Sequence, residues 1–340
     1  MLVGGPFIAW DNQRLMLLQT AVVGTAGVGA TLILISKGLD LSVGSTIALG
    51  TMVIALVSRA GGAPALAAAA GIGAGLAIGA SIGSMVVGRL SRAAALVAAV
   101  GVGWWASGHW GAWPSVGAGL GAGAVMLIAG EFLLPKVELS PFIVTLGLWG
   151  ALHGVAKGLG DNQPVYPKEP GWLLDLMTPA EGGLGAVLPP GVWVMLAVAL
   201  VFAGLIRWTV LGRRAVAIGS NETAARYAGV NIARVKLWVY TLGVGAAGIA
   251  GVLQFSFLNI GDPTTAGGYE LKVIAAAVIG GASLSGGEGS VFGTLVGAFI
   301  MTVVDNGCTK LGLDNWVQEV VTGGIIVGAV VLDRVRAGRS

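Results

Sequence analysis

Long apolar runs that carry almost no charge occupy most of this chain of 340 residues. A helix needs about 20 predominantly apolar residues to cross the hydrocarbon core of a bilayer. Barrel strands would alternate polar with apolar residues, and these runs do not. We therefore predict an all-α polytopic membrane protein with about eleven transmembrane segments, within a range of about ten to twelve. The runs lie near residues 15–36, 42–58, 64–88, 93–113, 116–135, 139–159, 191–211, 232–258, 270–285, 289–306 and 315–333.

Two of these runs, 42–58 and 270–285, are shorter than the others. They could be half-helices or re-entrant segments rather than complete spans. A second pattern concerns packing: Gly71, Gly75 and Gly79 recur at every fourth residue. Small residues at this spacing form a flat stripe on a helix, which predicts close approach of a neighbouring helix.

The composition excludes several classes of protein. Charged residues make up 10% of the chain, against roughly 25% in soluble domains, and the mean hydropathy is +0.87. No water-soluble enzyme or disordered chain has such a composition. The sequence has no Lys/Arg-rich stripe, so we expect no nucleic-acid partner. One cysteine and two histidines are too few for a typical metal cluster, and we expect neither a metal nor a cofactor.

The positions of lysine and arginine orient the chain. With the C-terminal tail in the cytoplasm, thirteen basic residues fall inside and six, including Lys272, fall outside, as the positive-inside rule requires. Residues 1–340 then form a single transmembrane domain. It has a proline-rich, acidic outer loop at about 160–190 and a charged cytoplasmic loop at about 212–236.

The sequence also limits the source of energy for transport. Among the ionisable residues, only His153 lies well inside an apolar run, whereas proton- and sodium-driven carriers use such groups as relays. The sequence contains no G-x-x-x-x-G-K-[ST] phosphate-binding loop. The stretch Leu284–Glu288 is similar to the signature of ABC ATPases, but it lies between two apolar runs and is better interpreted as a glycine-rich turn.

Two polar segments stand apart from the apolar runs. In the first, residues 38–45, Asp40 or Ser42 can cap the following helix; alternatively, the segment is the exposed start of a broken helix that faces a transport pathway. In the second, residues 218–231, Ser220 or Asn221 can cap a short helix that Gly229 ends. That helix is either a solvated connector or a docking element for a cytoplasmic partner.

At these segments the chain resembles the membrane subunits of ABC importers of the ribose/xylose (simple-sugar) permease family. The similarity extends from about residue 20 to residue 333, although 64–135 is longer than in ribose-type members, as though a helix pair were inserted. The matching stretches are 37–45 (KGLDLSVGS), 140–147 (SPFIVTLG), 211–236 (LGRRAVAIGSNETAARYAGVNIARVK), 265–298 and 305–307 (DNG).

The resemblance implies a permease subunit that imports a monosaccharide, a pentose or similar sugar, by alternating access across the bacterial plasma (inner) membrane. ATP is hydrolysed by a separate cytoplasmic ABC ATPase subunit, so the chain itself is not an enzyme. The further partners are an extracytoplasmic solute-binding protein and a second permease copy, in a homo- or heterodimer within the lipid bilayer.

The same resemblance makes residues 219–230 the coupling helix that rests on the ATPase. The residues expected to couple are Asn221, Glu222, Ala224, Ala225, Arg226 and Gly229. For the translocation path we expect Asp40, Ser42, Ser45, Thr145 and Asn306. Two alternatives remain open: an ATP-independent facilitator or channel for small polar solutes, and an ABC permease for nucleosides or branched-chain amino acids.

Overall fold

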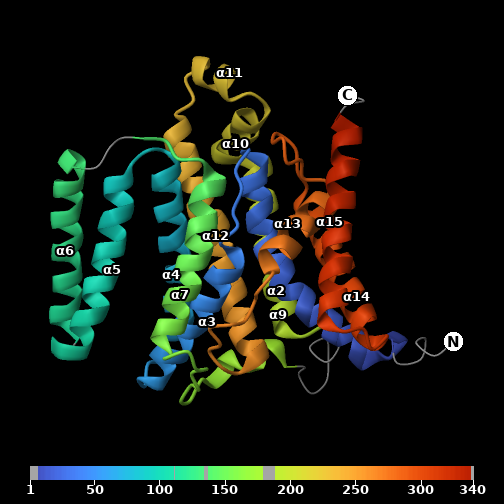
Figure 1. Cartoon of the computed structure of the whole chain (residues 1–340), viewed down its shortest axis with the longest axis horizontal. Helices are drawn as coiled ribbons and strands as arrows, with labels where there is room; N and C mark the ends of the chain where they lie inside the picture. Colours follow the sequence, from blue (N-terminus) through green and yellow to red (C-terminus); the bar gives the residue numbers. More distant parts are fainter. Residues whose placement is uncertain (1–6, 111, 134–136, 179–187, 338–340) are drawn as a thin grey trace.

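A computed structural model describes residues 7–110, 112–133, 137–178 and 188–337. The described residues are helical except for turns, connecting segments and one isolated antiparallel bridge between Val165 and Gly261. The prediction of an all-α membrane protein is therefore confirmed. Figure 1 shows the helices as a bundle with the two termini at opposite ends.

Each apolar run of the sequence forms a helix. Those long and apolar enough to cross a membrane are α2 (Trp10–Ile35), α4 (Pro64–Val86), α7 (Pro141–Leu159), α9 (Pro190–Trp208), α12 (Ile232–Leu258) and α14 (Val291–Lys310). The other runs form α3 (Val43–Arg59), α5 (Leu90–Trp110), α6 (Ala112–Leu133), α13 (Tyr269–Ile279) and α15 (Asn315–Ala337). The total number of spans stays a prediction.

The centre of the bundle is formed by α2 and α12. The apolar window of α2 is 94% buried and that of α12 is 72% buried, whereas that of α7 is only 17% buried. Helices α5 and α6 pack chiefly against each other, and α5 also contacts α4. Figure 1 shows this pair at the edge of the bundle, beside α4.

Glycine lets the central helices approach one another at backbone distance. A Cβ on Gly75 would lie 2.8 Å from Cα of Gly248, and one on Gly83 would lie 2.9 Å from Cα of Leu237. The glycine stripe of α4 therefore packs directly on α12, as its spacing predicts. Gly280 and Gly293 face each other in the same way where α13 meets α14, and neither position has room for a Cβ.

Helix α3 begins inside the bundle rather than at its surface. After α2 ends, residues 36–42 turn back, and the carbonyl of Leu39 accepts a hydrogen bond from Tyr240 Oη at 3.4 Å. Tyr240 is eight residues into α12, which corresponds to about 12 Å of helical rise. Figure 1 shows this connection descending between the helices before α3 starts.

Helix α13 also begins inside the bundle. Gly261 pairs with Val165 of the outer loop, and the backbone N–H of Asp262 donates to Thr51 Oγ1 at 3.2 Å. Ala266, further along this segment, lies against Gly44 of α3: a Cβ on Gly44 would lie 2.5 Å from the Ala266 carbonyl oxygen. Seven residues of α3 separate Thr51 from Gly44, about 10 Å of rise. The first turns of α3 and α13 therefore meet within the bundle, and the two helices run towards opposite ends.

A reciprocal amide pair joins the outer ends of α2 and α14. Asn12 Nδ2 donates to Asn306 Oδ1 at 2.9 Å, and Asn306 Nδ2 donates to Asn12 Oδ1 at 3.0 Å. Both side chains are buried, with 5% and 6% of their surface exposed. Each amide thus satisfies its partner in an apolar environment.

We predict that Gly293→Ala disrupts the contact between α13 and α14, because a Cβ would overlap the backbone of Gly280. Overpacking of this kind costs about 1–3 kcal/mol. Purified protein should lose thermal stability in a fluorescence-detected melting experiment. Gly147→Ala in α7 is the matched control, since nothing lies within 4 Å of that position. Equal melting temperatures for both variants would contradict the packing described here.

We predict that the Asn12–Asn306 pair contributes about 1 kcal/mol, in the range measured for interhelical hydrogen bonds in membranes. Either Asn→Ala change alone should lower the melting temperature, and the double change should cost less than the sum of the two. A double-mutant cycle measures this coupling. Strict additivity would show that the two amides do not interact.

Candidate functional site

A charged arm formed by α10 (Val210–Ser220) and α11 (Glu222–Tyr227) protrudes from the end of the bundle where the chain also terminates (Figure 1). Asn221 has an extended backbone that ends α10, and its Oδ1 accepts a hydrogen bond from the N–H of Ala224 at 2.9 Å. Gly229 ends the arm with a φ of +80°. The predicted capping role of Asn221 is thus confirmed. The predicted helix 219–230 is shorter, because Gly219 and Ser220 belong to α10.

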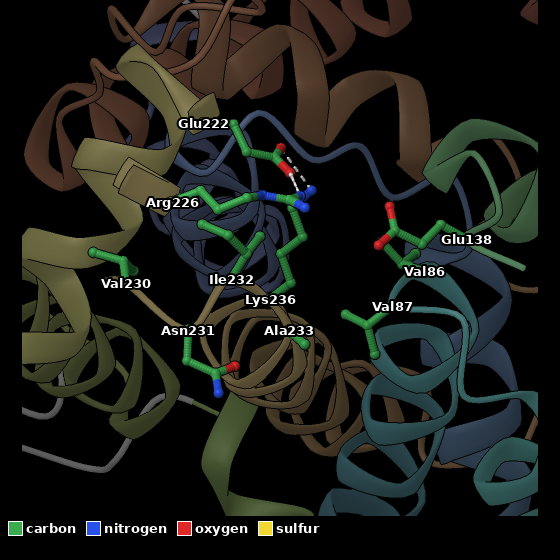
Figure 2. Close-up of a pocket in the computed structure, with 10 residues that line it drawn as sticks. All are labelled: Val86, Val87, Glu138, Glu222, Arg226, Val230, Asn231, Ile232, Ala233 and Lys236. Carbon is green, nitrogen blue, oxygen red and sulfur yellow. Dashed lines mark hydrogen bonds and ion pairs between the residues drawn. The ribbon is translucent and has the colours of Figure 1, made fainter. Parts of the chain in front are cut away.

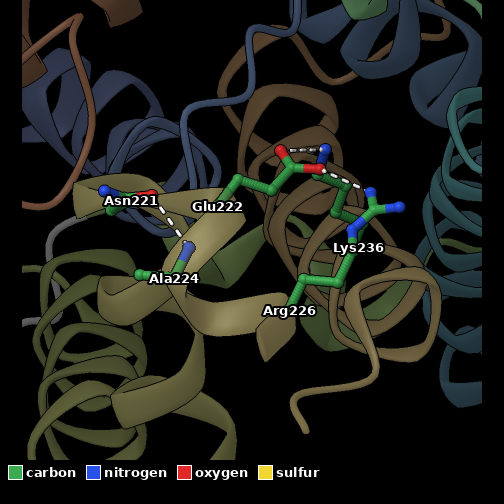
Figure 3. A network of polar contacts seen from close by, with 5 residues as sticks. All are labelled: Asn221, Glu222, Ala224, Arg226 and Lys236. Atoms are coloured by element: carbon green, nitrogen blue, oxygen red, sulfur yellow. Dashed lines mark hydrogen bonds and ion pairs between the residues drawn. The ribbon is translucent and has the colours of Figure 1, made fainter. Parts of the chain in front are cut away.

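An ion-pair network fixes α11 to the start of α12. Glu222 Oε2 lies 2.9 Å from Lys236 Nζ, and Glu222 Oε1 lies 3.5 Å from Arg226 Nη2 (Figure 3). Partial burial of Glu222 favours its neutral form, but the hydrogen bond from Lys236 and the charges of Lys236 and Arg226 outweigh burial and hold the pKa of this carboxyl below its ordinary value. The network is therefore formed at pH 7 and weakens only as the pH falls through that lowered pKa.

The two faces of α11 differ in exposure. Ala225 is 5% exposed and packs into the apolar cluster beneath the arm. Tyr227 is 88% exposed, although aromatic side chains are seldom left so open. The helix is thus anchored on its inner face and presents an aromatic ring outward.

A cavity of about 240 Å³ opens beside the network (Figure 2). The residues that line it come from the end of α4, the segment before α7, and the α11–α12 corner: Val86, Val87, Glu138, Glu222, Arg226, Val230, Asn231, Ile232, Ala233 and Lys236. Figure 2 shows Glu138 across the cavity from Arg226 and Lys236. The hollow therefore carries acidic and basic groups on facing walls.

The end of α10 is wedged against two other parts of the bundle. Gly219 has no room for a Cβ, because the carbonyl of Ile35 and the N–H of Gly287 lie against it. The N–H of Gly287 also donates to the Ile35 carbonyl at 2.9 Å. The glycine-rich turn 284–288, which lies between α13 and α14, thus links the arm to the end of α2.

The second polar segment lies at the buried start of α3. Asp40 Oδ1 accepts hydrogen bonds from the N–H of Ser42 at 2.8 Å and from its hydroxyl at 2.6 Å. Ser45 Oγ donates to the Ser42 carbonyl at 2.9 Å. All three side chains are buried. Ser42 occupies the N-cap position but makes no capping bond with its side chain, and its hydroxyl donates to Asp40.

The other two expected pathway residues lie elsewhere. Thr145 is buried near the start of α7, where its hydroxyl donates to the Pro141 carbonyl at 2.9 Å. Asn306 lies near the far end of α14 and is paired with Asn12. The structure thus gathers Asp40, Ser42 and Ser45 at one place and pairs Asn306 with Asn12 near the far end of α14.

The sequence reasoning missed charged groups inside the bundle. Glu270, in the first turn of α13, is 8% exposed. Lys272, which the orientation by basic residues places outside, forms an ion pair with Asp305 of α14 at 2.6 Å, and both side chains are about a quarter exposed. Glu270 stands at the start of its apolar run rather than well inside it, so the pattern that singles out His153 does not include it. Glu270 is buried because residues 259–268 turn back and place the start of α13 in the interior; the short apolar run 270–285 was the available signal.

The chain was compared with known proteins. The profile of the family described as "Branched-chain amino acid transport system / permease component" matches residues 85–330. Ribose import permease protein RbsC of Escherichia coli (strain K12) is 32% identical over 329 residues, 96% of this chain and 87% of that relative. D-allose transport system permease protein AlsC of the same strain is 30% identical over 328 residues, 96% of this chain and 85% of that relative.

A shorter match has a higher sequence identity. Probable ABC transporter permease protein YphD of Escherichia coli (strain K12) is 39% identical over 199 residues, which are 58% of this chain and 58% of that relative. No solved structure matched the chain. The chain belongs to the branched-chain amino acid transport system/permease component family and, within it, to the ABC importer permeases of the ribose (simple-sugar) type that its motifs resemble.

Proposed function

We propose that this chain is the membrane-spanning subunit of an ABC importer that carries a monosaccharide, a pentose or similar sugar, across the bacterial inner membrane. The observation that supports this most directly is the anchored α11, which presents an exposed Tyr227 beside the Glu222–Lys236 ion pair at the end of the bundle. The names of the relatives, a ribose and a D-allose permease, support a sugar as the cargo.

A cytoplasmic ABC ATPase docks on α11, with Asn221, Glu222, Ala224, Ala225, Arg226 and Gly229 forming the coupling element. Ala225 and the Glu222–Lys236 pair hold this element on the bundle, so a rigid-body movement of the ATPase reaches α12 directly. A second permease copy provides the other half of the pathway. ATP is hydrolysed by the partner.

The extracytoplasmic solute-binding protein docks at the opposite end, on the outer loop at about 160–190. The described part of this loop is fixed to the bundle by the Val165–Gly261 bridge and by the bond from Ser58 Oγ to the Lys168 carbonyl at 2.6 Å. Tyr166 is 70% exposed on it. The sugar then passes the buried start of α3, where Asp40, Ser42 and Ser45 meet, and Thr145 and Asn306 are the remaining proposed pathway residues.

A charge swap tests the anchoring of α11. Glu222→Lys places like charges together with Lys236 and Arg226 and should reduce sugar uptake at least tenfold, while the variant inserts in the membrane normally. Glu222→Lys combined with Lys236→Glu restores the 2.9 Å pair in reversed polarity and should recover most of the uptake. The measurement is uptake of radiolabelled D-ribose by cells that lack other ribose carriers. Equal uptake by the single variant and the native chain would contradict the proposed coupling role.

A pair of tyrosine variants separates the two docking surfaces. Tyr227→Ala should lose the ATPase in a detergent pull-down from native membranes, because an exposed ring at the arm is removed. Tyr166→Ala, at the opposite end, should keep the ATPase and weaken stimulation of ATP hydrolysis by the binding protein. Recovery of the native chain without any ATPase would instead support a self-sufficient facilitator.

A further inference from the structure

Four buried oxygen atoms in the described part of the chain have no hydrogen-bond partner: Asp40 Oδ2, Thr46 Oγ1, Gln254 Oε1 and Glu270 Oε2. Buried polar atoms without a partner are uncommon, and each requires an explanation. The cost is higher still for a carboxylate within a membrane domain. Their positions are therefore informative about what the protein handles there.

Asp40, Thr46 and Glu270 lie at or beside the starts of α3 and α13. Thr46 lies in the first turn of α3, two residues after Gly44, and Asp40 precedes that helix. A Cβ on Gly44 would lie 2.5 Å from Glu270 Oε2. Gln254 of α12 joins the same place, because its Nε2 donates to Thr265 Oγ1 at 2.8 Å, next to the Ala266 that faces Gly44.

The amide oxygen is a pure acceptor, the two carboxyl oxygens accept hydrogen bonds when ionised, and the fourth atom is a hydroxyl. Such a set suits a ligand that brings several hydrogen-bond donors. Ionised carboxyl groups disfavour an anion. The nearest described cation on the same helix, Lys272, is already paired with Asp305.

The surroundings of Glu270 suit the same kind of ligand. Its carboxyl group interacts with Trp149 and His153 of α7, whose rings pack edge to face with centroids 5.7 Å apart. Trp149 is 40% exposed. A carboxylate beside a partly open indole offers hydrogen bonds and an apolar ring face together, which are the two kinds of contact that a sugar ring can use.

We infer that the meeting point of α3 and α13 is a substrate site within the membrane, where Glu270, Asp40, Thr46 and Gln254 accept hydrogen bonds from the hydroxyl groups of a neutral sugar. This inference rests on the proposed function. The site is closed in this structure, since Asp40, Thr46 and Glu270 are all less than 9% exposed. The sugar reaches it when α3 and α13 separate during the transport cycle.

The first test compares two sugars. Cells that express the native importer should take up D-ribose in preference to 2-deoxy-D-ribose. Glu270→Gln, which keeps the shape of the side chain, should reduce D-ribose uptake at least tenfold and narrow the preference between the two sugars. Glu319→Gln on α15, an exposed carboxylate, is the matched control. An unchanged sugar preference in Glu270→Gln would overturn the inference, because a merely structural residue lowers both rates equally.

The second test does not depend on how well Glu270→Gln folds. Cys308 is the sole cysteine, so Cys308→Ser with Thr46→Cys places one thiol at the site. In membranes that contain the complete importer, a hydrophilic methanethiosulfonate reagent should modify this thiol during ATP turnover, and D-ribose should slow the reaction at least fivefold. Asp314→Cys in the same background, in the exposed turn before α15, should react at a rate that the sugar does not change.

The proposed cargo and the proposed site fail in different ways. A native importer that takes up neither D-ribose nor any other pentose or hexose would refute the proposed cargo. An importer that takes up D-ribose while the thiol at position 46 stays unreactive, or reacts without protection by the sugar, would overturn the site proposed here.

Discussion

The fold depends on one constraint: within the hydrocarbon core, each backbone N–H and C=O group must find a partner inside the protein. Helices meet this requirement by themselves, but residues 36–42 and 259–268 are not helical, and parts of both lie within the bundle. They are tolerated because side chains of α12 and α3 bond to their backbone. Tyr240 Oη donates to the Leu39 carbonyl, and Thr51 Oγ1 both accepts from the Asp262 N–H and donates to its carbonyl. Side chains of neighbouring helices thus satisfy the backbone of two non-helical segments.

The same constraint explains why glycine is so frequent. Helices that begin inside the bundle, as α3 and α13 do, are short and offer little length for packing. In lipid, no hydrophobic effect drives helices together. Close backbone contact at Gly75, Gly280 and Gly293 provides dispersion contacts instead. The cost is low tolerance: at these positions even one methyl group displaces a neighbouring helix.

Much of this architecture could be predicted from local sequence. The apolar runs located the helices, the lysine and arginine bias placed the 212–236 loop and the C-terminus at one end, and Asn221 was identified as a cap. These features depend on neighbours within a few residues. The depth at which α3 and α13 begin could not be predicted in this way. A polar segment between two apolar runs, such as 38–45, has the same local sequence pattern whether it lies at a surface or inside a bundle.

Contacts between residues distant in sequence could not be predicted either. Lys236 lies fourteen residues from Glu222, and Asn12 lies 294 residues from Asn306. No periodicity connects such pairs. Glu270 could have been recognised only by asking why a run as short as 270–285 begins with two charged residues, Glu270 and Lys272.

The small bridge between Val165 and Gly261 has a thermodynamic consequence. It ties the outer loop to the segment that leads into α13, while the turn after α13 lies against Gly219 at the end of α10. One eleven-residue helix therefore stands between the two surfaces of the protein. If a contact at one surface shifts the equilibrium position of α13, linkage requires that a contact at the other surface be strengthened or weakened by the same free energy. Binding at one side of the membrane then changes the binding free energy at the other side by the same amount in both directions.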